Sequence, residues 1–185
     1  MVTWRYQRLD KHRMVPTFII NTKMKKIALS FLIAVSNITV WSQSIIPINY
    51  EFDYSRMTIN KMEAIGYIAA NESNDNETPE EAFRRFTKKT DIAFVSIVNG
   101  KVLLDKGYKL DNQEKSQYKV KIYFKNVDKD GEHTIYAEVY DNNTNTMIRS
   151  FSAHAGGGSW GTFLHLFYER MEKSGKQFGK KLLAK

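Results

Sequence analysis

A serine between closely spaced glycines is the first arrangement in this chain that suggests chemistry. Residues 157–161, Gly-Gly-Ser-Trp-Gly, fit the G-x-S-x-G pattern that exposes a nucleophilic serine at a strand-to-helix turn of α/β hydrolases. Such a triad needs an acid and then a histidine further along the chain, yet only His165 follows Ser159 and no aspartate does. A small secreted serine hydrolase is therefore the alternative interpretation, and a glycine-rich loop is the main one.

Other candidate metal and cofactor sites lack essential members. Residues 126–131 resemble the start of a calcium loop, but Ala137 stands where a bidentate glutamate is required, so a hairpin turn is predicted. His133, His154 and His165 have no metal-ligand spacing and are each expected at the surface or in a turn. Without a nucleotide-binding glycine pattern either, the sequence predicts no metal and no cofactor.

Hydrophobic periodicity predicts the elements around these residues. Residues 118–124, 134–140 and 146–154 each alternate between apolar and polar side chains, as half-buried strands do. Polar turns separate the three segments, with Asp130-Gly131 in the first turn. These segments predict an antiparallel three-strand meander.

A long amphipathic helix is predicted over residues 161–183, after a run too rich in glycine to be a strand. Gly175 lies in the middle of its apolar stripe at a cost of roughly 1 kcal/mol relative to alanine, which suggests close approach of the helix to a strand. The predicted stripe comprises Leu164, Phe167, Tyr168, Met171, Gly175, Phe178 and Leu182.

The middle of the chain gives clear start signals. Residues 48–55 alternate and predict an opening strand. Asn60, with Glu63 three residues later, predicts a capped helix that ends near Asn71. Thr78, followed by a proline and two glutamates, predicts a second helix start.

Residues 92–105 allow two interpretations. One is a β-hairpin with its tight turn at Asn99-Gly100, which local propensity favours. The other is a continuation of the second helix that ends at Gly107, and a resemblance given below favours it. The helix would turn Phe94, Ile97, Val98 and Leu104 inward.

The beginning of the chain resembles a secretory signal. Met24-Lys25-Lys26 opens a short basic segment, an apolar run follows over residues 27–41, and cleavage is expected after Ser42. Residues 1–23 are then an over-long start, residues 24–42 a signal peptide and residues 43–185 a single domain. The alternative is an amino-terminal membrane anchor that is never cut.

Charge and cysteine content limit the function classes. The chain has 28 basic and 20 acidic residues, but the first 42 hold seven of the basic and one of the acidic, which leaves 21 against 19, or +2. Nucleic-acid binding therefore loses its main support. The absence of cysteine excludes disulfides and the usual lipoprotein anchor.

Several of these segments carry a resemblance. The signal, the opening strand, the closing hairpin, the Gly-Gly-Gly-x-x-Gly-x-Phe-Leu run at 156–164 and the Ser-Gly-Lys-Gln-Phe-Gly-Lys tail at 174–180 resemble small secreted proteins of unknown function from Gram-negative bacteria. In arrangement the domain is similar to the α/β modules of envelope accessory proteins, such as the amino-terminal domain of TolB and the curli-assembly lipoprotein. That resemblance implies strand–helix–sheet–helix order, and hence a helix over residues 92–105.

The expected fold is α+β: a small, mostly antiparallel sheet, made of the meander and the amino-terminal strand, with helices on one face and a long carboxy-terminal amphipathic helix. The expected function is an exported, non-enzymatic module that binds a protein or envelope component of the periplasm or cell surface, with no stable membrane span after cleavage. Exposed aromatic side chains are common anchors of such contacts. The predicted contact residues are Tyr123, Tyr136, Tyr140, and Gly156, Gly157, Gly158, Ser159 and Trp160 of the glycine loop.

Overall fold

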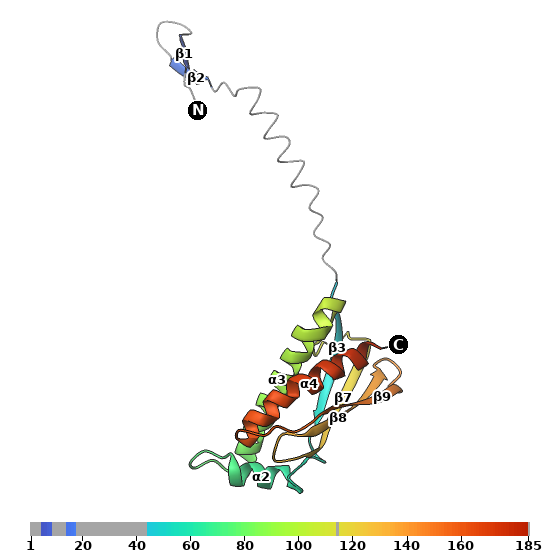
Figure 1. Cartoon of the computed structure of the whole chain (residues 1–185). Helices are drawn as coiled ribbons and strands as arrows, with labels where there is room; N and C mark the ends of the chain where they lie inside the picture. Colours follow the sequence, from blue (N-terminus) through green and yellow to red (C-terminus); the bar gives the residue numbers. More distant parts are fainter. Residues whose placement is uncertain (1–4, 9–13, 18–43, 114, 185) are drawn as a thin grey trace. The chain divides into compact units, whose positions relative to one another are not determined.

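The computed structural model describes residues 5–8, 14–17, 44–113 and 115–184 (Figure 1). The chain divides into two compact units, Met1–Ser42 and Gln43–Lys185. In the first unit, β1 (Arg5–Arg8) pairs with β2 (Met14–Thr17) in an antiparallel hairpin. The predicted signal peptide, residues 24–42, lies outside the described residues. No helix in the described ranges is both long and apolar enough to cross a bilayer.

The second unit is built on a seven-stranded sheet. The meander is confirmed, because β7 (Tyr118–Val127), β8 (His133–Asp141) and β9 (Thr146–Ala155) pair antiparallel in chain order. On its other side β7 pairs with β3 (Ile46–Asp53), and β3 pairs with β6 (Tyr108–Leu110). Two short strands, β4 (Thr58–Ile59) and β5 (Met62–Glu63), continue the sheet beyond the end of β3.

The sheet is mixed, so the prediction of a mostly antiparallel sheet was wrong. β3 runs parallel to β7 and to β6, and β4 also runs parallel to β7. The reason is the connection: between β3 and β7 the chain forms helices that return it to the end where β3 began, and a strand entered from that end runs parallel. Alternation within a strand carries no signal for the direction of its partner.

The predicted cap at Asn60 was also wrong. Asn60 and Lys61 have φ of 50° and 67° and form the two-residue turn that joins β4 to β5. Positive φ at both central residues is typical of the type I′ hairpin turn, which asparagine favours. Helix α2 (Ala64–Asn71) therefore begins later than expected, although it ends at the predicted residue.

The long middle helix confirms the second start signal. In α3 (Pro79–Val98) Thr78 and Glu81 form a complete capping box around Pro79. The helix continues through a π-helical turn, Asn99–Leu103, and a 3₁₀ turn, Leu104–Lys106, to Gly107 at φ +75°. Residues 92–105 are thus helical, as the resemblance implied, with Gly107 as the stop.

Asn99-Gly100 forms no hairpin turn, because the Asn99 side chain has another role. Its amide donates to the Leu110 carbonyl oxygen at 3.1 Å and accepts from the Leu110 N–H at 2.7 Å, so it completes the ladder of β6. The wider π-helical turn also changes the phase of the helix. Leu103 is fully buried and Leu104 is 43% exposed, so the expectation that Leu104 turns inward was wrong.

Helix α4 (Phe163–Leu183) closes the fold, with Thr162 as its N-cap. Figure 1 shows α3 and α4 lying across the same face of the sheet. The predicted stripe is confirmed, but the close approach at Gly175 is to a helix instead of a strand. A Cβ at Gly175 would lie 2.8 Å from Ile97 Cγ2 of α3, and one at Gly179 would lie 2.8 Å from Val102 Cβ.

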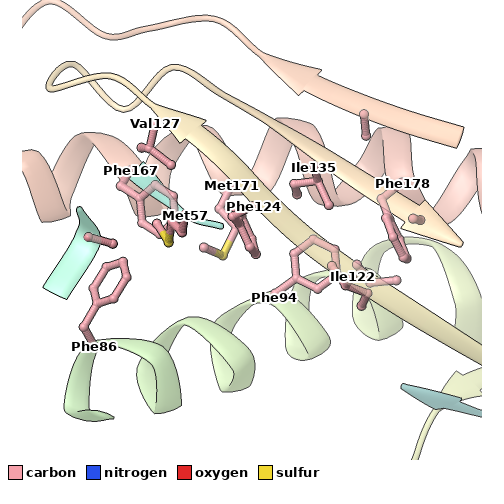
Figure 2. Close-up of a cluster of buried hydrophobic side chains, with 14 of the residues drawn as sticks. Met57, Phe86, Phe94, Ile122, Phe124, Val127, Ile135, Phe167, Met171 and Phe178 are labelled. Atoms are coloured by element: carbon pink, nitrogen blue, oxygen red, sulfur yellow. The ribbon is translucent and has the colours of Figure 1, made fainter. Parts of the chain in front are cut away.

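The core lies between these two helices and the sheet (Figure 2). Phe94 of α3 meets Phe178 of α4 edge-to-face, with ring centroids 5.0 Å apart. Nearer the start of α3, Phe86 lies 5.6 Å from Phe167 of α4. Phe124 of β7 packs beneath the helices, 5.8 Å from the Phe167 ring. Such pairs stabilise the fold beyond their buried area, by about 0.5–1.5 kcal/mol each.

Side chains of α4 also cover the outer edge of β9. The His154 N–H donates to Gln177 Oε1 at 3.3 Å, and Lys181 Nζ donates to the Ser152 carbonyl oxygen at 2.7 Å. An uncovered edge would offer these groups to another strand. At this stretch of β9, the addition of another strand is therefore blocked. The helices leave the opposite face of the sheet uncovered.

The two kinds of glycine in the helices give a paired stability prediction. Gly179→Ala should lower the free energy of unfolding by about 1–3 kcal/mol, because the new methyl group meets Val102 close to the α3 extension. Gly66→Ala in α2 should instead raise it by roughly 0.5–1 kcal/mol, since nothing lies within 4 Å of its Cβ position. Denaturant unfolding measures both, and a stabilising Gly179→Ala would contradict the close helix contact.

Candidate functional site

The face of the sheet opposite the helices carries the three tyrosines that the sequence analysis selected for binding, Tyr123, Tyr136 and Tyr140. Strand pairing places Lys121 beside Glu138, Tyr123 beside Tyr136, and Lys119 beside Tyr140 on this face. Glu51 and Asp53 join them from β3, since they pair with Lys121 and Tyr123. We call this surface the open face. Its members are Asn49, Glu51 and Asp53 of β3, Lys119, Lys121, Tyr123 and Lys125 of β7, Thr134, Tyr136, Glu138 and Tyr140 of β8, and Ser150, Ser152 and His154 of β9.

A shared carboxylate fixes two of the tyrosines. Glu138 Oε2 accepts the hydroxyl of Tyr123 at 2.5 Å and that of Tyr140 at 2.7 Å. These hydrogen bonds, of which the one from Tyr123 has the largest effect, hold the pKa of Glu138 below its usual value. Burial and then the bond to Glu138 raise the pKa of Tyr123, and the bond to Glu138 raises that of Tyr140. At neutral pH the three groups therefore form one carboxylate that holds two phenols in place.

Tyr136 presents its ring differently. It is 39% exposed, and Lys125 Nζ lies 4.6 Å from its ring centroid, within the range of a cation–π contact. Lys121 Nζ lies farther, 6.0 Å, from the ring of Tyr140. Lysine ammonium groups thus border the rings of Tyr136 and Tyr140. Of the three tyrosines, Tyr136 is the most exposed.

A hollow of about 620 Å³ lies over this cluster. Asp53, Arg56 and the side chains around Tyr123, Tyr136 and Glu138 line it. The Ser55 hydroxyl and N–H hold the pKa of Asp53 below its usual value, so both carboxylates of the hollow are ionised at neutral pH. With cations at Arg56, Lys121 and Lys125, the hollow offers both signs of charge around an aromatic centre, a surface suited to binding a polypeptide.

Sequence reasoning missed Glu138, Lys125, Asp53 and Arg56. Alternation alone puts Glu138 between Tyr136 and Tyr140 on the same face, so the strand pattern contained a signal for it. The pattern held no such signal for Asp53 and Arg56, because they reach the tyrosines only through the parallel pairing of β3 with β7.

The structure does not bring the glycine loop into the same site. None of the described residues that line the hollow comes from Gly156, Gly157, Gly158, Ser159 or Trp160. The loop instead packs against its neighbours: the Gly158 N–H donates to the Asp130 carbonyl oxygen at 2.8 Å, and a Cβ at Gly157 would lie 2.1 Å from an Asp130 carboxylate oxygen. Its glycines thus allow close packing, while Trp160 is 88% exposed.

The geometry around Ser159 does not assemble a triad. Ser159 is exposed in the loop before α4, and His165, on the first turn of α4, lies with its ring against Gly161. Among the described side chains, no hydrogen bond joins Ser159 to His165. No observation at this loop favours the hydrolase interpretation over a packed glycine loop.

The serine and histidine that do meet are His133 and Ser174, and both are buried. The expectation that His133 lies at the surface was wrong, because it is 1% exposed between β8 and α4. Its Nδ1 lies 2.8 Å from the Gly131 carbonyl oxygen and its Nε2 lies 2.8 Å from Ser174 Oγ. Since a carbonyl only accepts, Nδ1 donates, and the neutral ring accepts the Ser174 hydroxyl.

Burial is the main influence on the charge of His133. It lowers the pKa to about 4, against the raising effect of the Gly131 carbonyl, and the nearby His154 lowers it further. The described residues hold no cluster of three or more side chains arranged to bind a metal. The Ser174–His133 pair is therefore a structural contact sealed in the core.

Comparisons with known proteins found similar structures but no family to which the chain can be assigned. No family model matches the chain, and none of the curated proteins does. Among solved structures, the chain is similar to protein XCC0632 of Xanthomonas campestris, of the DUF330 family model, at TM-score 0.41 and 16% identity over 78% of this chain and 85% of that one.

Two further structures are similar at the same level. A PelC dodecamer from Paraburkholderia phytofirmans has TM-score 0.37 and 11% identity over 72% of this chain and 86% of that one. A protein described as uncharacterised has TM-score 0.38 and 11% identity over 75% and 90%. Likeness at these TM-scores carries no argument about function, which has to come from the site itself.

His133 gives a prediction for the dependence of stability on pH. Its pKa in the folded state is about 4, below the 6.5 of an unperturbed histidine, so the unfolded chain binds the proton first as pH falls. The free energy of unfolding should therefore fall by up to about 3 kcal/mol between pH 6.5 and pH 4 through this group alone. Chemical denaturation at a series of pH values measures it.

The matched control is the double variant His133→Leu/Ser174→Ala, which removes both polar partners together. Its free energy of unfolding should fall less than that of the unmodified chain over the same interval, because His133 no longer takes up a proton. The fall that remains comes from other acid-sensitive groups, which both proteins share. Parallel curves for the two proteins would contradict the assignment of a neutral buried His133.

Proposed function

We propose that this chain is an exported, non-enzymatic module that binds a protein partner of the cell envelope through the open face. The observation that carries the proposal is the convergence of Tyr123, Tyr136 and Tyr140 on the one sheet face that the helices leave uncovered. Tyrosine is enriched at the centres of protein interfaces because it offers a large apolar area with a polar end.

The open face is suited to binding because part of it is already ordered. Glu138 holds the Tyr123 and Tyr140 side chains on the sheet, so a partner loses less side-chain entropy when it fixes them. The Glu51–Lys119 pair, at 2.5 Å, similarly orders the border of the face. Tyr136, with Lys125 over its ring, is then the natural central contact.

Charge on the open face supports a protein partner. The cations at Arg56, Lys121 and Lys125 alternate with carboxylates at Asp53 and Glu138, so the hollow presents no single-sign field of the kind that binds nucleic acid. Mixed charges around an aromatic centre favour a specific polypeptide with complementary charges.

The non-enzymatic part of the proposal rests on the state of the polar groups on the open face. Tyr123 and Tyr140 have raised pKa values and donate to Glu138, so these two phenols are held as neutral hydrogen-bond donors. Export rests on the sequence: the basic start at Met24 and the apolar run over 27–41 have the layout of a secretory signal.

A site-specific cross-link tests the open face. A photo-reactive amino acid at position 136, in cells that make the full chain, should give a discrete cross-linked product, because Tyr136 is the most exposed of the three tyrosines. The matched control is position 92 on α3, where Ile92 is also exposed, at 63%, but away from the open face. Gel shift and mass spectrometry identify the product.

Two outcomes would overturn the open-face assignment: equal products from both positions, or a product from position 92 alone. Tyr136→Ala should weaken partner binding by roughly tenfold or more, the size of an interface hot spot. Ser159→Ala should leave the cross-linked product unchanged, whereas loss of an activity in that variant would support the hydrolase alternative.

The mature amino terminus tests export separately. Intact-mass measurement of the protein recovered from the envelope should give a chain that begins at Gln43, one residue after the predicted cleavage site. A chain that still begins at or before Met24 would contradict cleaved export. The cross-linking test of the open face does not depend on this result.

A further inference from the structure

Exposed apolar side chains gather at one end of the domain. β3, β6, β7 and β9 all begin at this end, and the last turn of α4 reaches it, because Arg149 near the start of β9 binds the final α4 carbonyls. We call it the basal end. Five of the nine exposed large hydrophobic residues of the described chain lie here: Ile45 at 49%, Ile46 at 42%, Leu104 at 43%, Met147 at 53% and Ile148 at 52%.

A β-bulge contributes to this concentration. In the pairing of β8 with β9, Val139 faces Arg149 and Tyr140 faces Met147, so Ile148 is an extra residue without a partner across the ladder. Bulges redirect side chains and are frequent beside functional sites. Here the bulge leaves Ile148 half-exposed at the end of the core.

An apolar groove opens beside Ile148. Its volume is about 630 Å³, within the range of roughly 300–1,000 Å³ that small-molecule sites occupy. Tyr108, Tyr118 and Leu183 are among the apolar residues that line it. Ile148 belongs both to the groove and to the exposed apolar side chains of the basal end, and large exposed apolar patches mark protein or membrane contacts.

The charges at the groove indicate which occupant fits. Among the described residues that line it, the charged ones are Lys106 and Arg149, and both are cations. Arg149 is held in place by the Leu182 and Ala184 carbonyl oxygens, whereas Lys106 is exposed and free to meet a ligand. An apolar groove whose described charged lining residues are both cations matches a molecule with an apolar chain and an anionic head.

The sequence adds a second reason to choose a lipid. The apolar run over residues 27–41 is typical of a segment that engages a bilayer during export, and only four residues separate it from Ile46 at the basal end. In the precursor, before the proposed cleavage after Ser42, the basal end is therefore the part of the domain joined to the bilayer-directed segment of the chain.

We propose that the basal groove binds the acyl chain of an anionic phospholipid and so docks this end of the domain on a bilayer surface. Basic side chains attract anionic headgroups, and buried apolar side chains add to this attraction. The proposal does not depend on the open face, which lies on the sheet surface around β7 and β8, and neither result decides the other.

The chain contains no cysteine, so a single introduced cysteine can report on one position of the full chain. Ile148→Cys, labelled with an environment-sensitive fluorophore, should show a blue shift and a several-fold rise in emission with phosphatidylglycerol vesicles, and a smaller change with phosphatidylcholine vesicles. Ile92→Cys carries the same label at an exposed isoleucine of α3 and should not respond. Equal responses at both positions, or none at position 148, would overturn the proposal.

Charge reversal separates groove binding from simple tethering by the amino-terminal segment. In the Ile148→Cys background, Lys106→Glu should weaken the response to phosphatidylglycerol by about tenfold, since one attractive charge becomes repulsive. Lys88→Glu, at an exposed lysine of α3, is the matched control and should leave it unchanged. An unaffected response in Lys106→Glu would mean that tethering alone brings position 148 to the vesicle, and it would overturn the proposal.

A blue shift that grows with protein concentration without vesicles would also overturn the proposal, in favour of a second copy of the chain at the basal end.

Discussion

The contact between α3 and α4 at two glycines is the constraint on which the rest of the structure depends. Two helices can cover one face of a sheet only if they lie side by side over the same strands. Gly175 and Gly179 remove the side chains that would hold α4 away from Ile97 and Val102. With the helices this close, Phe94 reaches Phe178, and Phe86 reaches Phe167, above the strands (Figure 2). One layer of helices then covers the inner face except at the basal groove, and it leaves the outer face uncovered.

The sequence predicted what short-range patterns can encode. Alternation gave the three strands of the meander, and the Thr78 capping box with Pro79 gave the start of α3. Local pattern could not give the direction of β3, because parallel pairing is decided by where the crossover returns the chain. It also failed at Leu104, because one π-helical turn moved the buried position to Leu103.

The same distinction explains the candidate site. Tyr123, Tyr136 and Tyr140 were predictable because each occupies an outward position in a regular antiparallel pair. The contribution of β3 was not, since it depends on a pairing between residues about 70 apart in sequence. His133 shows a third kind of failure: a polar residue at an inward position is expected to be exposed unless its partner is known, and Ser174 lies 41 residues away.

The bulge in β9 links the two surfaces proposed for binding. Arg149 pairs with Val139, so in a regular strand Ile148 would stand opposite Tyr140 on the open face. With the bulge, Met147 takes the position opposite Tyr140, and Ile148 has no partner across the ladder. Arg149 meanwhile faces inward and binds the final carbonyls of α4, where its positive charge also favours the negative end of the helix dipole. The inserted residue thus places Ile148 at the basal groove, with the fixed cation of Arg149 beside it. The bulge lies where the open face meets the basal end, so the two contacts proposed above would use different surfaces of the domain.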